Sequence, residues 1–444
     1  MENKIGKLWN RIKGHSITKN YIWVFLGQNI GSVFSMLSLM ITLRLISAEK
    51  YGALVVIQTY CLLIANIFGL RTFNGIIKYI TQQDAKGDVR LAQKYINTAF
   101  LLDGIAGVVA FVAGFFLLDT VRMLMGWEAE TVRYVNMYLP VVLFAPIKGG
   151  ASVGMLRKLD HFKQVNLLHA TVYGIQTGTL CLALCLKLTD FRLIIAIYML
   201  TELAECLCLL IMSLYVLQKK SKYAGFWKQG FSGDRSFISY NIFYGLTSTF
   251  DQLLGNVSTL LINRFAGNFT TAYIKVITQI CSVFSKLTSP FSQIFYPELC
   301  RWVANKQYCR AKKVANQYFL IVAGIGSGIV LLMTVTFQWW IVLFDASMAA
   351  AKWQSLLYMV YTLLSVAIVC INQLTFALDL VKENLALVII FDLLYLALLI
   401  PSINTWGVYG YLVLQIAQLL AVVGGKHIFI TRKIKKLAAS VQTE

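Results

Sequence analysis

The sequence predicts an all-α polytopic membrane protein with about twelve transmembrane helices. Two observations carry this prediction. First, 58% of the 444 residues are hydrophobic and only 14% are charged, whereas soluble domains are roughly 45–50% apolar and about 25% charged. Second, apolar windows of about 20 residues, the length at which an α-helix crosses the hydrocarbon core, recur along the whole chain. Because these runs are continuous and do not alternate with a period of two, they exclude a transmembrane β-barrel.

The predicted spans follow one another with short connections and no soluble domain between them. Their centres lie near Gly31, Leu62, Gly107, Leu143, Gln176, Ala204, Phe250, Phe284, Gly326, Leu364, Leu393 and Gln415. Pro401 is expected to end the eleventh span, because proline cannot donate to the helical hydrogen-bond ladder. Residues 1–20 contain no apolar core of the kind found in cleaved signal peptides, so we expect the first span to stay in the membrane.

Lysines and arginines are concentrated in alternate loops, which predicts the orientation of the chain. The longest basic segment is QKKSKYAGFWKQGFSGDR at 218–235, whereas the opposite loops hold only scattered cations such as Lys50 and Arg122. We therefore predict a multi-pass protein with both termini in the cytoplasm. The net charge of +20 then reflects this topology, and no nucleic acid is expected as a partner.

Two stretches of the chain resemble each other at a constant offset. The segment AKGDVRLAQKYINTAFLL at 85–102 is similar to ANKQYCRAKKVANQYFLI at 304–321. A repeat with six spans returns the chain to the side on which it began, so both halves enter the membrane from the same side. We predict two parallel-repeat six-helix bundles, at 1–220 and 235–444, joined by a cytoplasmic linker at 221–234.

A polar stripe runs along the predicted eighth span. Helical spacing places Lys275, Gln279, Lys286 and Gln293 on one face. A lysine in the middle of a span costs roughly 2.5–3.5 kcal/mol, and such residues face a water-filled cavity or the bundle interior. The predicted substrate-binding residues, which include polar positions of spans one, four and seven, are Lys286, Lys275, Lys148, Gln279, Gln293, Gln252, Asn256 and Gln28. Spans one, two, seven and eight are expected to line one aqueous cleft between the halves.

Other charged residues inside the spans leave alternatives open. Lys148, about two-thirds of the way across span four, could line the cavity or extend to the inner surface. Asp251, near the middle of span seven, could pair with Lys286 or bind a coupling ion. Glu202 and Glu205 lie one turn apart in span six, away from the predicted cleft, and a structural role is expected for them.

Several catalytic and metal-binding motifs do not occur in the sequence. It contains no GxxxxGK[ST] or HExxH pattern, which excludes a built-in P-loop ATPase and a zinc protease of the HExxH type. The cysteines and the four histidines match no metal-ligand spacing. We therefore expect a protein that is not an enzyme, with no catalytic residues, no metal and no cofactor.

The chain resembles the polysaccharide-type flippases of the multidrug/oligosaccharidyl-lipid/polysaccharide exporter superfamily over nearly its whole length. The resemblance is carried by NYIWVFLGQNIGSVFSMLSLMITLRLISAEKYGAL at 20–54, which includes Tyr51 and Gly52, and by GMLRKLDHFKQVN at 154–166. It implies two six-helix bundles around a central cavity that works by alternating access. The cationic cavity of the family corresponds here to Lys275, Lys286 and, less directly, Lys148.

The resemblance also implies a substrate and a location. The substrate would be an undecaprenyl-pyrophosphate-linked oligosaccharide, moved across the bacterial inner membrane for O-antigen, capsule or exopolysaccharide assembly. The partners would be the lipid bilayer, this substrate and a coupling cation, H⁺ or Na⁺. Two other functions remain open: a multidrug/cation antiporter of the same superfamily, which needs a cavity dominated by carboxylates, and a membrane oligosaccharide polymerase or ligase, which needs catalytic groups on its outer loops.

Overall fold

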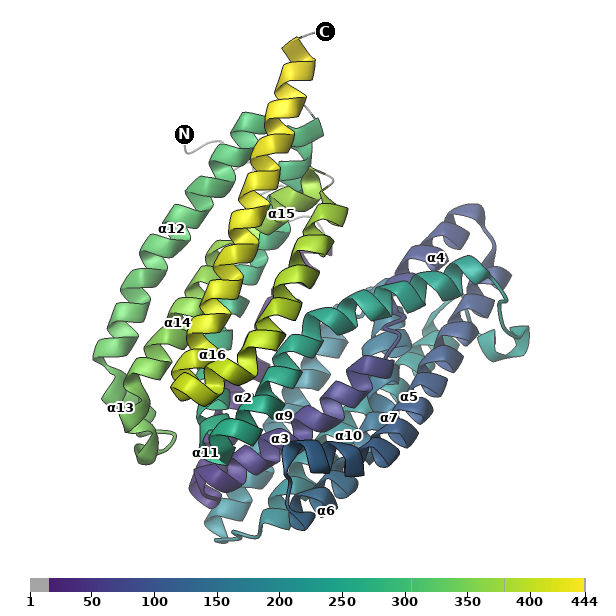
Figure 1. The fold of residues 1–444 in the computed structure, drawn as a ribbon. Helices are drawn as coiled ribbons and strands as arrows, with labels where there is room; N and C mark the ends of the chain where they lie inside the picture. Colours follow the sequence, from purple (N-terminus) through teal and green to yellow (C-terminus); the bar gives the residue numbers. More distant parts are fainter. Residues whose placement is uncertain (1–15, 305, 379, 443–444) are drawn as a thin grey trace. The chain divides into compact units, whose positions relative to one another are not determined.

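The computed structural model is drawn in Figure 1. It describes residues 16–304, 306–378 and 380–442. Inside the helices, some side chains lie outside the description, namely those at 16–26, 28, 74, 78, 85, 243–244, 246–254, 283–298, 300–301, 304, 376, 381–382 and 438–442. The described residues form α-helices with a few 3-10 and π-helical turns and no strand, so the predicted all-α fold is confirmed.

The chain divides into two compact units, residues 1–260 and 261–444. Unit 1 holds α2 (Ser16–Leu45), α3 (Ala48–Phe68), α4 (Phe73–Lys86), α5 (Val89–Met125), α6 (Ala129–Tyr138), α7 (Pro140–Ile147), the π-helical η1 (Lys148–Ser152), α8 (Val153–Lys158), α9 (Phe162–Cys185), α10 (Phe191–Lys220), the 3-10 turn η2 (Phe226–Gln229) and the first part of α11 (Arg235–Ala304). The predicted boundary between the two repeats lies at 221–234. It concerns repetition in the sequence, which the division into compact units does not test, so it stays a prediction.

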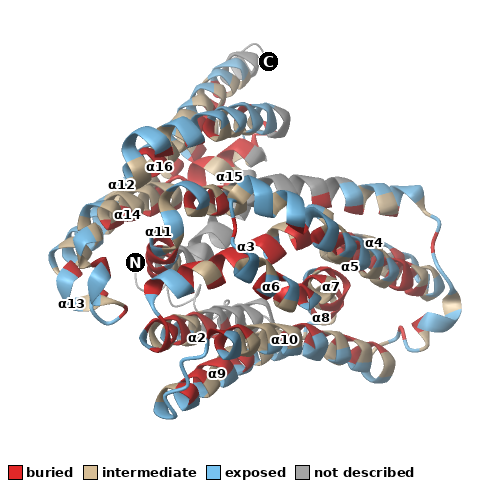
Figure 2. Ribbon diagram, turned by 60° about the horizontal axis from the view of Figure 1, so that its bottom comes forward, coloured by how far each residue is buried: buried red, intermediate tan, exposed pale blue. Residues whose placement is uncertain are grey.

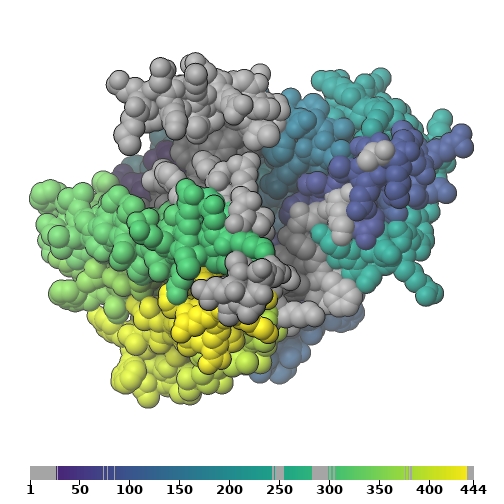
Figure 3. All heavy atoms as spheres, turned by 90° about the horizontal axis from the view of Figure 1, so that it is seen from above, coloured from purple at the N-terminus to yellow at the C-terminus, as the bar shows by residue number. Residues whose placement is uncertain are grey.

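Unit 2 begins within α11. It continues through α12 (Tyr308–Val335), α13 (Phe337–Ile341), the 3-10 turn η3 (Ala346–Ala351), α14 (Lys352–Ala367), α15 (Val369–Ala377) and α16 (Val381–Gln442). Figure 3 shows the green and yellow side chains of this unit packed against one another. Its core lies where α12, α15 and α16 meet, around Ala311, Ala315, Leu374 and Ile430.

The helices account for the predicted spans. Each of the twelve predicted centres falls on a residue that the structure describes as helical. Within the described residues, seven helices are long and apolar enough to cross a membrane, and eight if the bent pair Ala129–Tyr138 and Pro140–Lys158 counts as one span. One of these is the long stretch Glu383–Leu437 of α16, which a kink divides into two arms.

Glycines, and not proline, break the two longest helices. We predicted that Pro401 ends the eleventh span, and this was wrong: α16 continues through Pro401 and breaks at Gly407, where φ is 56°. Proline removes one hydrogen bond from the ladder, but the break uses a left-handed residue, and glycine adopts that conformation without steric cost. A Cβ on Gly410 would overlap the carbonyl oxygen of Ser402, so the two arms also need a glycine at their closest approach. Helix α11 is broken in the same way at Gly267, where φ is 83°.

Burial within the units is consistent with a lipid environment. In unit 1, 61% of the apolar window of α3 is buried, and α3 carries buried positions along its length in Figure 2. In unit 2, only 6% of the apolar window of α12 is buried. The exposed residues of this helix include the apolar Leu320, Ile325 and Leu331. Apolar faces of this size are covered in a stable protein. We conclude that this is a multi-pass membrane protein.

A single carboxylate holds one end of the 221–234 linker against the rest of unit 1. Asp84, near the end of α4, accepts hydrogen bonds from the Tyr223 hydroxyl at 2.8 Å and forms ion pairs with Lys222 at 2.8 Å and Lys158 at 3.0 Å. Burial by itself would raise the pKa of this carboxyl, but the hydrogen bonds from the two lysines and the tyrosine outweigh burial and lower it. Helix α4 is not one of the apolar spans.

We predict that Asp84→Asn loosens the linker at neutral pH. Because the folded pKa is lowered, the stabilisation is complete above the ordinary aspartate pKa of about 3.9 and is lost as the pH falls through the folded value. The linker of the variant should therefore be as loose at pH 7 as the linker of the wild type is below about pH 4. The measurement is the rate of tryptic cleavage at Lys222 and Lys228. Asp88→Asn is the matched control, because asparagine can still cap α5; equal cleavage of the two variants would contradict the prediction.

Candidate functional site

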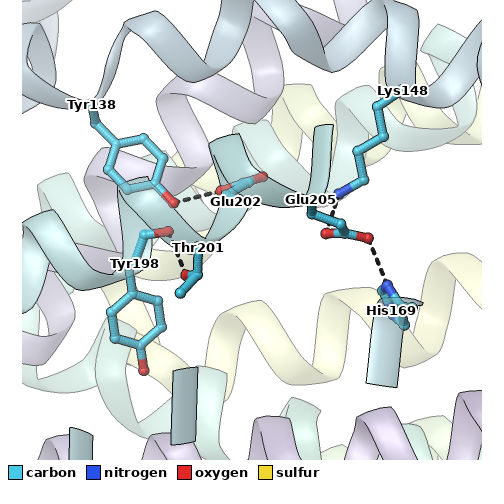
Figure 4. A network of polar contacts seen from close by, with 7 residues as sticks. All are labelled: Tyr138, Lys148, His169, Tyr198, Thr201, Glu202 and Glu205. Atoms are coloured by element: carbon cyan, nitrogen blue, oxygen red, sulfur yellow. Dashed lines mark hydrogen bonds and ion pairs between the residues drawn. The ribbon is translucent and has the colours of Figure 1, made fainter. Parts of the chain in front are cut away.

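Unit 1 contains a buried carboxylate that is held by two basic side chains from other helices. Glu205 of α10 lies between Lys148 of η1 and His169 of α9 (Figure 4). Its Oε2 is 2.6 Å from Lys148 Nζ, and its Oε1 is 2.7 Å from His169 Nδ1. The Glu205 side chain is only 5% exposed, whereas that of Lys148 is 27% exposed and that of His169 is 38% exposed. The accessible face of this cluster, which we call the basic triad, is therefore made by its two basic members.

A break in the regular helix positions Lys148. The segment η1 is a π-helical turn between α7 and α8, in the sequence PIKGGAS, and single π-turns of this kind often lie at functional sites. The turn frees the N–H of Ala151, which donates to Asp103 Oδ2 of α5 at 2.7 Å. The Thr72 hydroxyl donates to the same oxygen at 2.6 Å. A Cβ on Gly150 would overlap the Asp103 carboxylate, so the turn requires glycine there.

His169 is placed by the close packing of α9 on α2. A Cβ on Gly27 would overlap the Asn166 side chain, and a Cβ on Gly31 would lie 3.2 Å from the His169 ring. Two small residues one turn apart let the helix backbones approach, as in many membrane helix pairs. The His169 ring also packs edge-on against Tyr173, with ring centroids 4.7 Å apart. An ionised carboxylate only accepts hydrogen bonds, so Nδ1 carries the proton that His169 shares with Glu205.

A second polar cluster lies one turn earlier on α10. The Tyr138 hydroxyl donates to Glu202 Oε2 at 2.5 Å, and it accepts from Gln58 Nε2 at 3.3 Å. The Thr42 and Tyr198 hydroxyls lie 2.9 Å apart. Figure 4 shows Tyr138 and Glu202 beside the triad, with Glu202 and Glu205 on the same stretch of α10. Both α10 carboxylates are thus engaged by protein groups from other helices, which offsets the cost of burying them.

The triad has a chemistry that its separate members lack. With a neutral imidazole, one ammonium balances one carboxylate, and the net charge is zero. With an imidazolium, the net charge is +1, and both cations are held by hydrogen bonds to a carboxylate behind them. Such a group can offer N–H donors to an anion that arrives from the accessible side. Within the described residues, no group of three or more His, Cys, Asp or Glu side chains could hold a metal ion.

In unit 1, the structure describes the side chains of two predicted site residues, Lys148 and Asn256. Lys148 has its ammonium bonded inside unit 1, to Glu205. Asn256, on the part of α11 in unit 1, is half-buried, and its Nδ2 has no hydrogen-bond partner among the described residues. Glu202 and Glu205 were expected to be structural, and the structure joins Glu205 to Lys148, a contact that the sequence analysis did not foresee.

In unit 2, Lys275 of α11 is exposed and Gln279, one turn later, is half-buried. Nearby, the Thr278 hydroxyl is 3.0 Å from that of Tyr358. A further lysine that the sequence analysis missed, Lys426 of α16, is buried and donates to Asn372 Oδ1 at 2.9 Å. Five predicted residues have side chains outside the described part of the structure: Gln28, Asp251, Gln252, Lys286 and Gln293.

Known proteins resemble this chain in fold over nearly its whole length. The structure is similar to the inward-facing form of a multidrug resistance MATE family transporter of the MOP superfamily, with a TM-score of 0.77, 15% identity and coverage of 92% of this chain and 96% of that one. A MOP superfamily transporter from Pyrococcus furiosus has a TM-score of 0.60 and 14% identity, with 94% and 96% covered. At these identities the similarity establishes the fold alone.

Sequence comparison identifies the family. The inner membrane protein YghQ of Escherichia coli (strain K12) is 22% identical over 156 residues, which are 35% of this chain and 43% of that protein. The chain therefore matches less than half the length of this relative. The family model described as polysaccharide biosynthesis protein matches residues 17–302, which is more than half of the chain, and it confirms the resemblance found in the sequence. The chain belongs to the polysaccharide biosynthesis protein family.

Proposed function

We propose that the protein is a flippase that moves an undecaprenyl-pyrophosphate-linked oligosaccharide across the bacterial inner membrane for surface polysaccharide assembly. The observation that carries the proposal is the basic accessible face of Lys148 and His169, backed by the enclosed Glu205. A phosphate group at this face would meet an ammonium and an imidazole in surroundings of low dielectric, where charge-assisted hydrogen bonds are strong. Family membership supports a role in polysaccharide synthesis.

The other residues have proposed roles in the same process. Lys275 and Lys286 would neutralise the pyrophosphate while the lipid tail stays in the bilayer. The amides of Asn256 and Gln279, together with those of Gln28, Gln252 and Gln293, would bind sugar hydroxyls. Asn256 Nδ2 has no hydrogen-bond partner among the described residues, which supports this role. We propose alternating access, with both termini in the cytoplasm and with reset by H⁺ or Na⁺ at Asp251.

The similarity to MATE transporters favours a second candidate, a multidrug/cation antiporter. A cationic drug needs carboxylates that are available to it. In unit 1, the carboxylates of Glu202 and Glu205 are already bonded to Tyr138, Lys148 and His169. The Pyrococcus furiosus protein is described as having a binding pocket of reverse polarity that suggests a different function. We therefore use the charge of the binding site to choose between the substrate classes. The accessible face of the triad is basic, which favours an anionic substrate.

We predict that Lys286→Glu abolishes transport while the protein still inserts into the membrane. A carboxylate in place of the ammonium would repel the pyrophosphate and remove its counter-charge. The measurement is mass spectrometry of lipids from the native host with the gene deleted and complemented. Lipid-linked oligosaccharide of full repeat length should accumulate in the deletion strain and with the variant. The wild type should clear it.

The control is Lys435→Glu, a charge reversal at an exposed position near the C-terminal end of α16. It should clear the lipid as the wild type does. Clearance by Lys286→Glu would overturn the role of Lys286. If no lipid accumulates in the deletion strain and its drug susceptibility rises, the antiporter function is correct; if only the polysaccharide chain length changes, the protein acts as a polymerase or ligase.

A further inference from the structure

The linker at 221–234 is an ordered part of unit 1 and not a slack connection. Besides the bonds to Asp84, its backbone carbonyls are bound by α5. Gln93 Nε2 donates to the Ala224 carbonyl at 3.0 Å, and Asn97 Nδ2 donates to the carbonyls of Phe226 at 2.6 Å and Gly230 at 2.9 Å. The segment appears in Figure 1 as a teal loop beside α4 and α5.

The second half of the linker is fastened in the same way. The Ser232 N–H donates to the Thr98 hydroxyl at 2.7 Å, and the Tyr95 hydroxyl donates to Asp234 Oδ2 at 2.6 Å. The inward aromatic residues Tyr223 and Phe226 are buried in the core formed with α4, α5 and α11. Hydrogen bonds and core packing together fix the conformation of the linker, so the orientation of its outward side chains is fixed as well.

The outward side of the linker combines aromatic and basic residues. Trp227 is 51% exposed and Phe231 is 60% exposed. The Trp227 ring is supported by the buried Phe226, with ring centroids 4.7 Å apart. Around them, the exposed cations are Lys219, Lys220, Lys222, Lys228 and Arg235. Two acidic residues near this surface, Asp84 and Asp234, are bonded to the side chains that hold the linker in place. We call this outward surface the linker face.

We propose that the linker face is a docking surface for anionic phospholipid headgroups of the leaflet on its side of the membrane. Amphipathic rings such as that of tryptophan concentrate at the headgroup level, and lysine clusters beside a span attract anionic lipids. Because the protein already holds the segment in place, docking costs little conformational entropy. The charge of the surface matches this partner, and the inference does not depend on which substrate is transported.

The experiment uses the full chain in nanodiscs of pure phosphatidylcholine or of phosphatidylcholine with phosphatidylglycerol. The measurement is hydrogen exchange of the peptide that covers 224–233, together with the melting temperature. Anionic lipid should slow the exchange severalfold and raise the melting temperature, and added salt should reverse both effects. The combined change of Lys219, Lys220 and Lys228 to glutamine should abolish the response, and Trp227→Ser with Phe231→Ser should reduce it.

The matched control removes the same number of charges elsewhere, by changing Arg432, Lys433 and Lys435 to glutamine. This variant should keep the lipid response of the linker peptide. The proposal is wrong if the linker peptide exchanges equally in both nanodiscs, or if the control loses the response as fully as the linker variant. Inorganic pyrophosphate is added in a separate arm: protection by it and not by phosphatidylglycerol would assign the surface to the phosphates of a substrate instead of a lipid.

Discussion

The Glu205→Met variant is expected to lose transport and to melt at a lower temperature than the wild type. Breaking a buried ion pair by removing one partner costs about 3–5 kcal/mol, because the other charge is left without compensation. Because 27% of the Lys148 side chain is exposed, the cost will be smaller than this. Lys148→Met should behave similarly, since Glu205 is then held by His169 alone. Thermal unfolding of the purified protein measures the first effect and clearance of lipid-linked oligosaccharide the second.

The double variant Lys148→Met/Glu205→Met separates folding from function. Replacing both members of a buried pair by apolar residues of similar volume is often neutral for stability. We therefore expect the double variant to recover much of the melting temperature that each single variant loses. Transport should not recover, because the ammonium proposed to meet the phosphate is gone. Recovery of both properties would show that the pair serves only to hold α10 against η1.

The membrane spans could be predicted because one physical property decides them. A long apolar run in lipid has to be helical, whatever its neighbours are. The position of a break is a different matter, since it depends on one residue. Pro401 was the obvious breaker, but the break uses a left-handed residue, and Gly407 supplies it.

The basic triad could not be predicted, because its members lie far apart in the sequence. Hydropathy reports which residues are buried but not which of them meet. Lys148, His169 and Glu205 come from three helices, and only the packing of α9 and α10 around η1 brings them together. The pair of glycines after Lys148 was a local signal of an irregular turn. Of the polar stripe that helical periodicity predicts on α11, Lys275 is exposed and Gln279 is half-buried. Lys286 and Gln293 lie outside the described side chains, so the stripe and the substrate roles of its residues remain predictions.

Asp103 holds the turn that carries Lys148, through a hydrogen bond from the Ala151 N–H. This carboxylate is fully buried, with Oδ2 bonded to Ala151 of η1 and Thr72 at the start of α4. Its other oxygen, Oδ1, has no hydrogen-bond partner in the described part of the chain. One oxygen thus joins the π-turn that carries Lys148 to the break between α3 and α4. We therefore expect Asp103 to act as a positioning residue for the triad, through the turn that carries Lys148.

Asp103→Ala is expected to reduce transport much more than a substitution elsewhere in unit 1 that lowers the stability to a comparable extent. The substitution leaves two buried donors without an acceptor, at about 1–3 kcal/mol each, and it frees η1 to move Lys148 away from Glu205. Asp103→Asn should keep most of the transport, because an amide oxygen can accept both hydrogen bonds. Tyr60→Phe is the matched control: it removes a buried hydrogen bond to Gly114 without touching η1. If Asp103→Ala and Tyr60→Phe reduce transport only in proportion to their melting temperatures, Asp103 stabilises the fold and has no separate effect on Lys148.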